Sequence, residues 1–368
     1  MILINYYPDV PPPSRINELS PHVTEPDDNI TPAAGVLNYG PFRLTPPLIE
    51  AALSGYSDAP MRRLAKRFGC PMALCEVFLD RFVMEVTKRS KARFYLAVKP
   101  EDHPCGAQLM GSEPEEFRAA ALRLLQCGFD LIDLNFACPV KKVLGRARGG
   151  SLMADPRRAL EIVQTVREAL PDSVPLSVKL RKGFDETPGS EEDFFTLLDG
   201  LLSRGVAGIT LHGRTVQQGY QGKSDWDFIR NVKRYLIEDK KRPDFFVIGS
   251  GDLFTADDCV KRYRETSVDG LALARGVIGN PWLFPQAAAA LAGEPIPPSP
   301  DLEEQKEVIL RHWSESEALY GAKRTTMMMR KFLIRYAALH PKGEEVKRAF
   351  VSFRGREGME NVLRRFYK

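Results

Sequence analysis

An asparagine and a cysteine near the middle of the chain have residue types and a spacing that suit chemistry at the end of a strand. Asn135 precedes Cys138 by three residues, and Pro139 follows the cysteine directly. Residues 131–135 form a short apolar run broken by one aspartate, which is typical of a strand buried in a parallel sheet. Because proline cannot extend a ladder, Cys138 is expected just past the strand's carboxyl end, where α/β folds place their chemistry. An inert buried thiol is the alternative interpretation.

The loop after the cysteine is basic. It holds Lys141, Lys142, Arg146 and Arg148 with no acidic residue among them, and a Gly-Gly pair follows at 149–150. The end of the chain is basic as well, because residues 321–368 carry thirteen Lys or Arg against four Asp or Glu. With an overall net charge of +4, the rest of the chain is mildly acidic. This asymmetry favours a polyanionic partner, although helix surfaces are often rich in Lys and Arg without binding one.

Other polar residues fall at the ends of further strand-like runs. They are Gln108, Lys179 with Arg181, His212, Ser250 with Gly251 and Asp252, and Ala274 with Arg275. Glycines at 251, 276 and 279 permit close backbone approach to a ligand, and the helix N-termini that follow favour anions. A phosphorylated ligand or cofactor is therefore expected. Taken singly, Lys179 could be an ion-pair partner and His212 a hydrogen-bonded core residue.

Eight strand-like runs alternate with helix-like segments and must position these residues. The expected strands are 48–53, 72–77, 105–110, 131–135, 176–180, 208–212, 245–249 and 270–274. Helix starts are indicated at Asp58, Ser112, Asp155, Ser190 and Thr255, each with a capping residue or acidic residues in the first turn. Eight such units over about 240 residues predict an α/β fold, a (β/α)8 TIM barrel. A doubly wound sheet is the alternative, since periodicity does not show closure.

Composition changes mark three regions. Residues 1–46 are rich in proline and are expected to form an extended, poorly ordered arm. Residues 47–292 form the expected barrel, and a Pro-rich linker precedes an all-helical C-terminal domain at 300–368. No apolar run approaches the roughly 18 residues of a membrane span, and the N-terminus is no convincing signal peptide. Six scattered cysteines indicate neither a metal site nor disulfides, so a reducing cytoplasm is expected.

Together these residues resemble the tRNA-dihydrouridine synthase family over about 47–360. The resemblance rests on Asn135-Phe-Ala-Cys138-Pro139 with Lys141-Lys142, on Gln108-Leu-Met-Gly, on Val178-Lys179-Leu-Arg181, and on Leu211-His212-Gly-Arg-Thr and Ala274-Arg275-Gly. The chain departs from the family pattern at Ala52-Leu53-Ser54-Gly55, where Pro-Met-Ala-Gly is usual, and at Ser250-Gly251-Asp252, where Asn-Gly-Asp is usual. A Lys-His pair expected in the C-terminal helices reads Lys331-Phe332.

The resemblance implies an FMN-dependent reduction of specific uridines in tRNA, with NADPH as the reductant. It implies that Cys138 gives the proton to C5 of the uracil, since a thiol with a pKa of about 8.5 is mostly protonated at neutral pH. The residues that it implies for holding FMN are Ala52, Leu53, Ser54, Gln108, Asn135, Lys179, His212, Ser250, Gly251, Asp252, Ala274 and Arg275. For the RNA it implies Lys141, Lys142, Arg146, Arg148, Lys331 and Arg335. No metal is expected, and the protein is expected to be a monomer.

Two other functions fit parts of the pattern. An FMN barrel that acts on a free dihydropyrimidine such as dihydroorotate also carries an Asn-x-x-Cys-Pro run, but it has no use for a basic helical tail. A non-catalytic RNA-binding barrel would explain the substitutions in the flavin loops. Dihydrouridine formation in an RNA other than tRNA also stays open.

Overall fold

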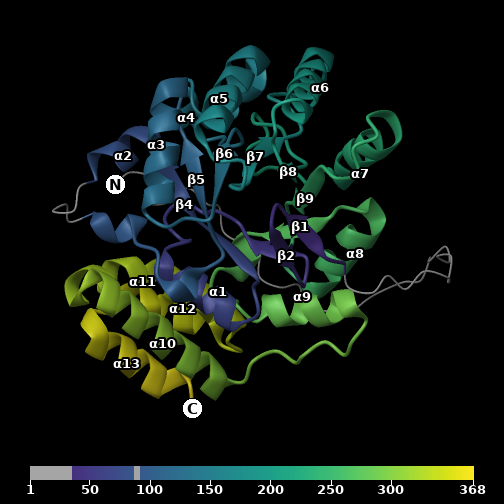
Figure 1. Cartoon of the computed structure of the whole chain (residues 1–368). Coiled ribbons are helices and arrows are strands. Elements are labelled where there is room, and N and C mark those ends of the chain that lie inside the picture. Colours follow the sequence, from purple (N-terminus) through teal and green to yellow (C-terminus); the bar gives the residue numbers. More distant parts are fainter. Residues whose placement is uncertain (1–34, 87–91) are drawn as a thin grey trace.

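A closed barrel of eight parallel strands forms the centre of the computed structural model, which describes residues 35–86 and 92–368 (Figure 1). The barrel strands are β3 (Leu48–Glu50), β4 (Met72–Leu79), β5 (Cys105–Met110), β6 (Leu131–Asn135), β7 (Leu176–Arg181), β8 (Gly208–His212), β9 (Phe246–Ser250) and β10 (Gly270–Leu273). Each strand pairs with the next in chain order, and β10 pairs with β3 to close the circle. The predicted barrel is confirmed, and the doubly wound alternative is wrong.

Strand bounds differ from the expected ones mainly at β3 and β4. β3 stops at Glu50, so residues 51–53 leave the sheet although the apolar run continues through them. β4 runs on to Leu79 and contains an irregular register between Leu74 and Val77. The apolar run at 48–53 therefore forms a short strand and then part of the first loop at the barrel's carboxyl end.

Helices follow the strands and cover the outside of the barrel (Figure 1). They are α1 (Ala59–Arg67), α2 (Asp80–Glu85), α3 (Pro114–Gln126), α4 (Lys141–Leu144), α5 (Pro156–Ala169), α6 (Pro188–Leu202), α7 (Trp226–Arg234), α8 (Ala256–Thr266) and α9 (Leu283–Ala292). Short 3-10 turns lie at Arg93–Leu96, Pro100–Asp102, Gly149–Ala154, Arg275–Val277 and Ala337–Leu339, and a π-helical turn, Tyr235–Asp239, extends α7.

The predicted helix starts are partly confirmed. The side chains of Asp58, Asp155 and Thr255 accept hydrogen bonds from the first turns of α1, α5 and α8. The predicted starts at Ser112 and Ser190 are wrong. α3 begins after Glu113, without a side-chain cap, and Thr187 caps α6. The Ser190 hydroxyl instead accepts hydrogen bonds from the backbone of 184 and 185.

The end of the expected N-terminal arm is ordered and packs against the barrel. β1 (Leu37–Tyr39) and β2 (Phe42–Leu44) form an antiparallel hairpin. Leu37 and Tyr39 are fully buried, and the Tyr39 ring lies 4.4 Å from that of Phe246 on β9. The expectation of a poorly ordered arm is therefore wrong for residues 37–44, and the rest of that prediction, residues 1–34, lies outside the described residues.

Residues 301–368 are helical, as predicted. α10 (Leu302–Tyr320), α11 (Ala322–Tyr336), α12 (Gly343–Ser352) and α13 (Gly355–Phe366) pack together beside α1 (Figure 1). Buried Trp313, Met329 and Phe332 belong to the same apolar cluster as residues of α1 and the barrel. The helices therefore share one core with the barrel. In the described part of the chain, none of the helices combines the length and apolar character needed to cross a bilayer.

Candidate active site

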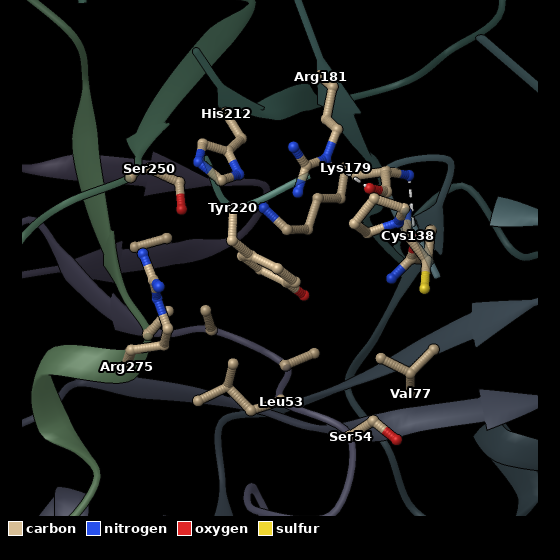
Figure 2. Close-up of a pocket in the computed structure, with 18 of the residues that line it drawn as sticks. Leu53, Ser54, Val77, Cys138, Lys179, Arg181, His212, Tyr220, Ser250 and Arg275 are labelled. Atoms are coloured by element: carbon tan, nitrogen blue, oxygen red, sulfur yellow. Dashed lines mark hydrogen bonds between the residues drawn. The ribbon is translucent and has the colours of Figure 1, made fainter. Parts of the chain in front are cut away.

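A pocket lies at the carboxyl ends of the barrel strands and is open to solvent (Figure 2). It brings together twelve of the thirteen residues predicted for catalysis and cofactor binding. They are Ala52, Leu53, Ser54, Asn135, Cys138, Lys179, His212, Ser250, Gly251, Asp252, Ala274 and Arg275. Gln108 is fully buried beneath Asn135 and is not part of the pocket wall.

Cys138 lies in a loop that Asn135 holds in place. The Asn135 Oδ1 atom accepts hydrogen bonds from the backbone N–H groups of Ala137 and Cys138, each at 3.0 Å. Burial raises the pKa of the Cys138 thiol, and this outweighs the opposing effects of a backbone hydrogen bond at Val140 and the charge of Arg181. The thiol is therefore protonated at neutral pH, which suits a proton donor and not a thiolate nucleophile.

Lys179 on β7 presents a buried cation without a hydrogen-bond partner among the described residues. Its Nζ atom is inaccessible to solvent, and its side chain extends toward the middle of the pocket (Figure 2). Burial, together with the nearby charge of Arg181, lowers the pKa of Lys179 to about 8. A buried ammonium without a partner is costly, so this position fits a ligand that supplies an acceptor or a negative charge.

Asp252 on the pocket wall joins two arginines, Arg275 of the same wall and buried Arg214, which does not line the pocket. Arg214 donates to both oxygens of Asp252, at 2.9 and 2.7 Å, and the Arg275 Nη2 donates to Asp252 Oδ1 at 3.2 Å. His212 lies half-buried beside these groups. Burial and then the charges of Arg181 and Lys179 keep the pKa of His212 well below its usual range, so its imidazole is neutral.

Neighbouring side chains and a positive φ require glycine at position 251 in this wall. Gly251 has φ +119°, and a Cβ atom there would lie 2.4 Å from Ser224 Oγ and 2.7 Å from the His212 ring. Only glycine fits this position. Among the charged side chains that line the pocket, the cations Lys179, Arg181 and Arg275 outnumber the carboxylate Asp252. Asp252 is already paired with Arg214 and Arg275. The site therefore suits an anionic ligand such as a phosphate ester.

Arg181 and Tyr220 are pocket residues that the site prediction omitted. The Arg181 Nε donates to the Ala137 carbonyl at 2.7 Å, and its Nη1 donates to the carbonyls of Thr215 and Gly219 at 2.9 and 2.8 Å. The Tyr220 ring lies between two guanidinium groups, with centroid distances of 5.8 Å to Arg181 and 5.4 Å to Arg275 (Figure 2). Strand alternation could have found Arg181, because it points to the same side of β7 as Lys179.

The residues predicted to bind RNA differ in how far they are exposed to solvent. Lys141, Lys142 and Arg146 are exposed beside the Cys138 loop. Arg148 is only 8% exposed, and its charge acts on the carboxylate of buried Asp80, which does not favour its predicted place on an RNA-binding surface. The basic loop ends inside the fold because Gly149 turns the chain back under Cys138.

Lys331 and Arg335 on α11 are half-buried where the helical region meets the barrel. The Lys331 Nζ lies 4.8 Å above the ring centroid of Tyr56, in the first loop at the carboxyl end of the barrel. Arg335 acts on the hydroxyl of the same tyrosine. Both basic residues are therefore engaged with the barrel, and RNA binding by them stays a prediction.

Comparison with known proteins matches this architecture to one family. The family model described as dihydrouridine synthase (Dus) matches residues 49–368. A probable tRNA-dihydrouridine synthase of Rickettsia typhi is 33% identical over 314 residues, which is 85% of this chain and 91% of the relative. The chain belongs to the dihydrouridine synthase family. The tRNA-dihydrouridine synthase B of Xanthomonas axonopodis is 31% identical, over 84% of this chain and 90% of the relative.

A dihydrouridine synthase is a flavin-dependent oxidoreductase, the class that the sequence predicted. Among solved structures, a complex of morphinone reductase with tetrahydroNAD aligns with a TM-score of 0.52 and 16% identity, over 73% of this chain and 93% of that chain. At that identity the likeness shows the barrel fold alone. A flavin fits this pocket on the evidence of the Lys179 ammonium, which lines it and has no hydrogen-bond partner among the described residues.

Proposed function

We propose that this protein reduces uridines of tRNA to 5,6-dihydrouridine, with FMN as its flavin and NADPH as the reductant. The observation that carries the proposal is a protonated, half-buried thiol, Cys138, on the wall of a cationic pocket at the carboxyl end of the barrel. Curated relatives named tRNA-dihydrouridine synthase share about a third of their residues with the chain over most of its length, which supports tRNA as the substrate.

The residues proposed to hold FMN lie on three sides of the pocket. Lys179 supplies positive charge for the electron-rich edge of the isoalloxazine. Arg275 and the backbone around Gly251 receive the phosphate, and residues 52–54 contact the ring system. Bound in its reduced form, FMN supplies the hydride that adds to C6 of the uracil.

Cys138 is proposed to complete the reduction by donating its thiol proton to C5. Hydride and proton together saturate the C5–C6 double bond, and the thiolate left behind recovers a proton from water. Asn135 fixes the backbone of Cys138 through two N–H groups, and Arg181 fixes the adjoining Ala137 carbonyl. The donor is therefore held from both sides, which reduces the entropy lost on reaching the reactive geometry.

The tRNA is proposed to lie across the pocket mouth, with its backbone on the exposed basic residues Lys141, Lys142 and Arg146 and on the basic helical region. The target base must leave its stack to enter the pocket. Recognition of this kind depends on charge and shape, so it weakens as salt is added.

The experiment that tests the proposal follows the visible spectrum of the anaerobic, FMN-loaded protein. We expect NADPH to bleach the flavin bands and unmodified tRNA to restore them, with a mass gain of about 2 Da in the tRNA for each uridine reduced, since a hydride and a proton are added. Restoration by a free pyrimidine and not by tRNA would replace the proposal with a small-molecule dehydrogenase. A protein that binds tRNA but cannot be loaded with FMN would leave an RNA-binding barrel.

A further inference from the structure

Polar side chains occupy the interior of the barrel beneath the active site. Bulky aliphatic side chains usually fill the interior layers of such barrels. Here Gln108 on β5, Asp133 on β6 and Ser177 on β7 are all fully buried inside the barrel wall. Burying polar groups is costly unless they are hydrogen-bonded, so their arrangement calls for a purpose.

These residues form one continuous chain of hydrogen bonds. The Asn135 Nδ2 donates to Gln108 Oε1 at 2.6 Å, and the Gln108 Nε2 donates to Asp133 Oδ2 at 2.6 Å. Ser177 Oγ donates to Asp133 Oδ1, and the Tyr39 hydroxyl is 2.5 Å from Ser177 Oγ. The chain therefore runs from the hairpin at one end of the barrel to the Cys138 loop at the other.

The direction of every bond between the Cys138 loop and Asp133 is fixed from the loop end. The backbone N–H groups of Ala137 and Cys138 can only donate, so Asn135 must turn its oxygen to them and its NH2 group downward. Because the Asn135 NH2 group then needs an acceptor, Gln108 must turn its oxygen upward and its NH2 group to Asp133 Oδ2, which accepts. The two amides then meet donor to acceptor, and in no other orientation are all partners satisfied.

We propose that Asp133 is a positioning residue, which through Gln108 and Asn135 holds the Cys138 loop in the geometry for proton donation. The proposal deepens the proposed function and rests on it. Ser177 donates to the other carboxylate oxygen and Tyr39 bonds Ser177 in turn, so both support Asp133 without lying on the path to Cys138. Substituting Asp133 removes the bond to Gln108, whereas substituting Ser177 removes only the bond to the other carboxylate oxygen. The two variants therefore form a matched pair.

The first test compares Asp133→Ala with Ser177→Ala. Asp133→Ala removes the acceptor for Gln108, so the amide pair and the Cys138 loop are freed; Ser177→Ala leaves that path intact. We expect Asp133→Ala to slow reoxidation of the reduced protein by tRNA at least tenfold while reduction by NADPH changes less than twofold. Ser177→Ala should change both rates less than twofold.

A second readout needs neither tRNA nor turnover. Iodoacetamide labels Cys138, and Cys127, a partly exposed cysteine at the end of α3, serves as the internal reference. We expect Asp133→Ala to raise the labelling rate of Cys138 relative to Cys127 several-fold. Equal labelling in wild type and Asp133→Ala, with unchanged reoxidation, would overturn the proposal. If even the wild type shows no tRNA-dependent reoxidation, the proposed function fails, and the labelling still decides the role of Asp133.

A charge exchange separates hydrogen-bond direction from mere packing. Gln108→Glu sets two carboxylates against each other, and we expect it to loosen the Cys138 loop. Adding Asp133→Asn places an amide at position 133 that donates to the carboxylate introduced at position 108, while Asn135 still donates to that same carboxylate. We expect the double variant to return the Cys138 labelling rate to within about threefold of wild type, whereas failure to recover would count against the directional chain.

Discussion

At the scale of single residues, the site depends on what burial does to charge. Burial raises the pKa of Cys138 and lowers that of His212, so the thiol stays protonated and the imidazole neutral, and it leaves Lys179 as a cation with a lowered pKa. The thiol is thereby prepared to give a proton, and the ammonium is prepared to meet an electron-rich ligand. The burial of the Lys179 ammonium also lowers the free energy of unfolding of the protein when no flavin is bound.

Replacing Lys179 by methionine should therefore stabilise the flavin-free protein while weakening flavin binding. The pKa of Lys179 falls from 10.5 to about 8 on folding, which costs about 3 kcal/mol below pH 8. As pH rises from about 8 to 10.5, the folded state loses this proton before the unfolded state, so the cost disappears. The stability gain of Lys179→Met should thus be largest below pH 8 and vanish near pH 10.5.

Urea unfolding of flavin-free protein at several pH values measures this gain. Lys223→Met, at an exposed position in the loop after β8, is the matched control and should change the unfolding free energy by less than about 0.5 kcal/mol. A pH-independent effect of Lys179→Met would contradict the assignment of the cost to the ammonium.

At the scale of elements, alternation along the strands decides what enters the pocket. Lys179 and Arg181 point inward from β7, and the sequence placed both at the strand end even though only Lys179 was assigned to the site. Residues 52–54 were assigned to the site through the family resemblance, because the strand pattern extended the first strand to residue 53, beyond its end at Glu50. The burial of Arg148 could not be predicted, because the neighbouring Gly149 packs against Cys138, a tertiary contact that no local pattern shows.

The β1–β2 hairpin is the element that the sequence concealed. Strands of three residues flanked by prolines carry almost no periodic signal, and their burial depends on tertiary contacts with β9. We expect Leu37→Ala, at a fully buried position, to lower the free energy of unfolding by about 2–5 kcal/mol.

The neighbouring Val36→Ala, at a position 36% exposed, is the control for the hairpin and should change that free energy by less than about 0.5 kcal/mol. Chemical denaturation of both variants gives the comparison. Equal, small effects would mean that the hairpin is not part of the barrel core.

At the scale of the whole molecule, basic residues are found both in the pocket of the barrel and in the C-terminal helical region. The sequence predicted the helical region and its basic character, because both follow from composition and 3.6-residue periodicity. It did not reveal that α10 and α11 share their core with the barrel. Lys331 and Arg335 consequently face the barrel at Tyr56, where only the tertiary structure could place them.

The exposed basic residues beside the pocket should carry part of the salt dependence of tRNA binding. Each phosphate contact contributes about 0.7 to 0.9 to the slope of log K against log salt. We expect the triple variant Lys141→Ala, Lys142→Ala, Arg146→Ala to reduce that slope by about 2. Filter binding at several salt concentrations measures it, with Lys99→Ala, in the loop preceding β5 at the opposite end of the barrel, as the control. An unchanged slope would place the tRNA elsewhere.

The central claim is that Cys138 donates the proton, and the rate at which tRNA reoxidises the NADPH-reduced protein tests it most directly. We predict that Cys138→Ala slows this single-turnover step by about 10²- to 10⁴-fold while NADPH still reduces the flavin at the wild-type rate. Cys127→Ala should leave both rates unchanged. Reoxidation of Cys138→Ala at the wild-type rate would contradict the account.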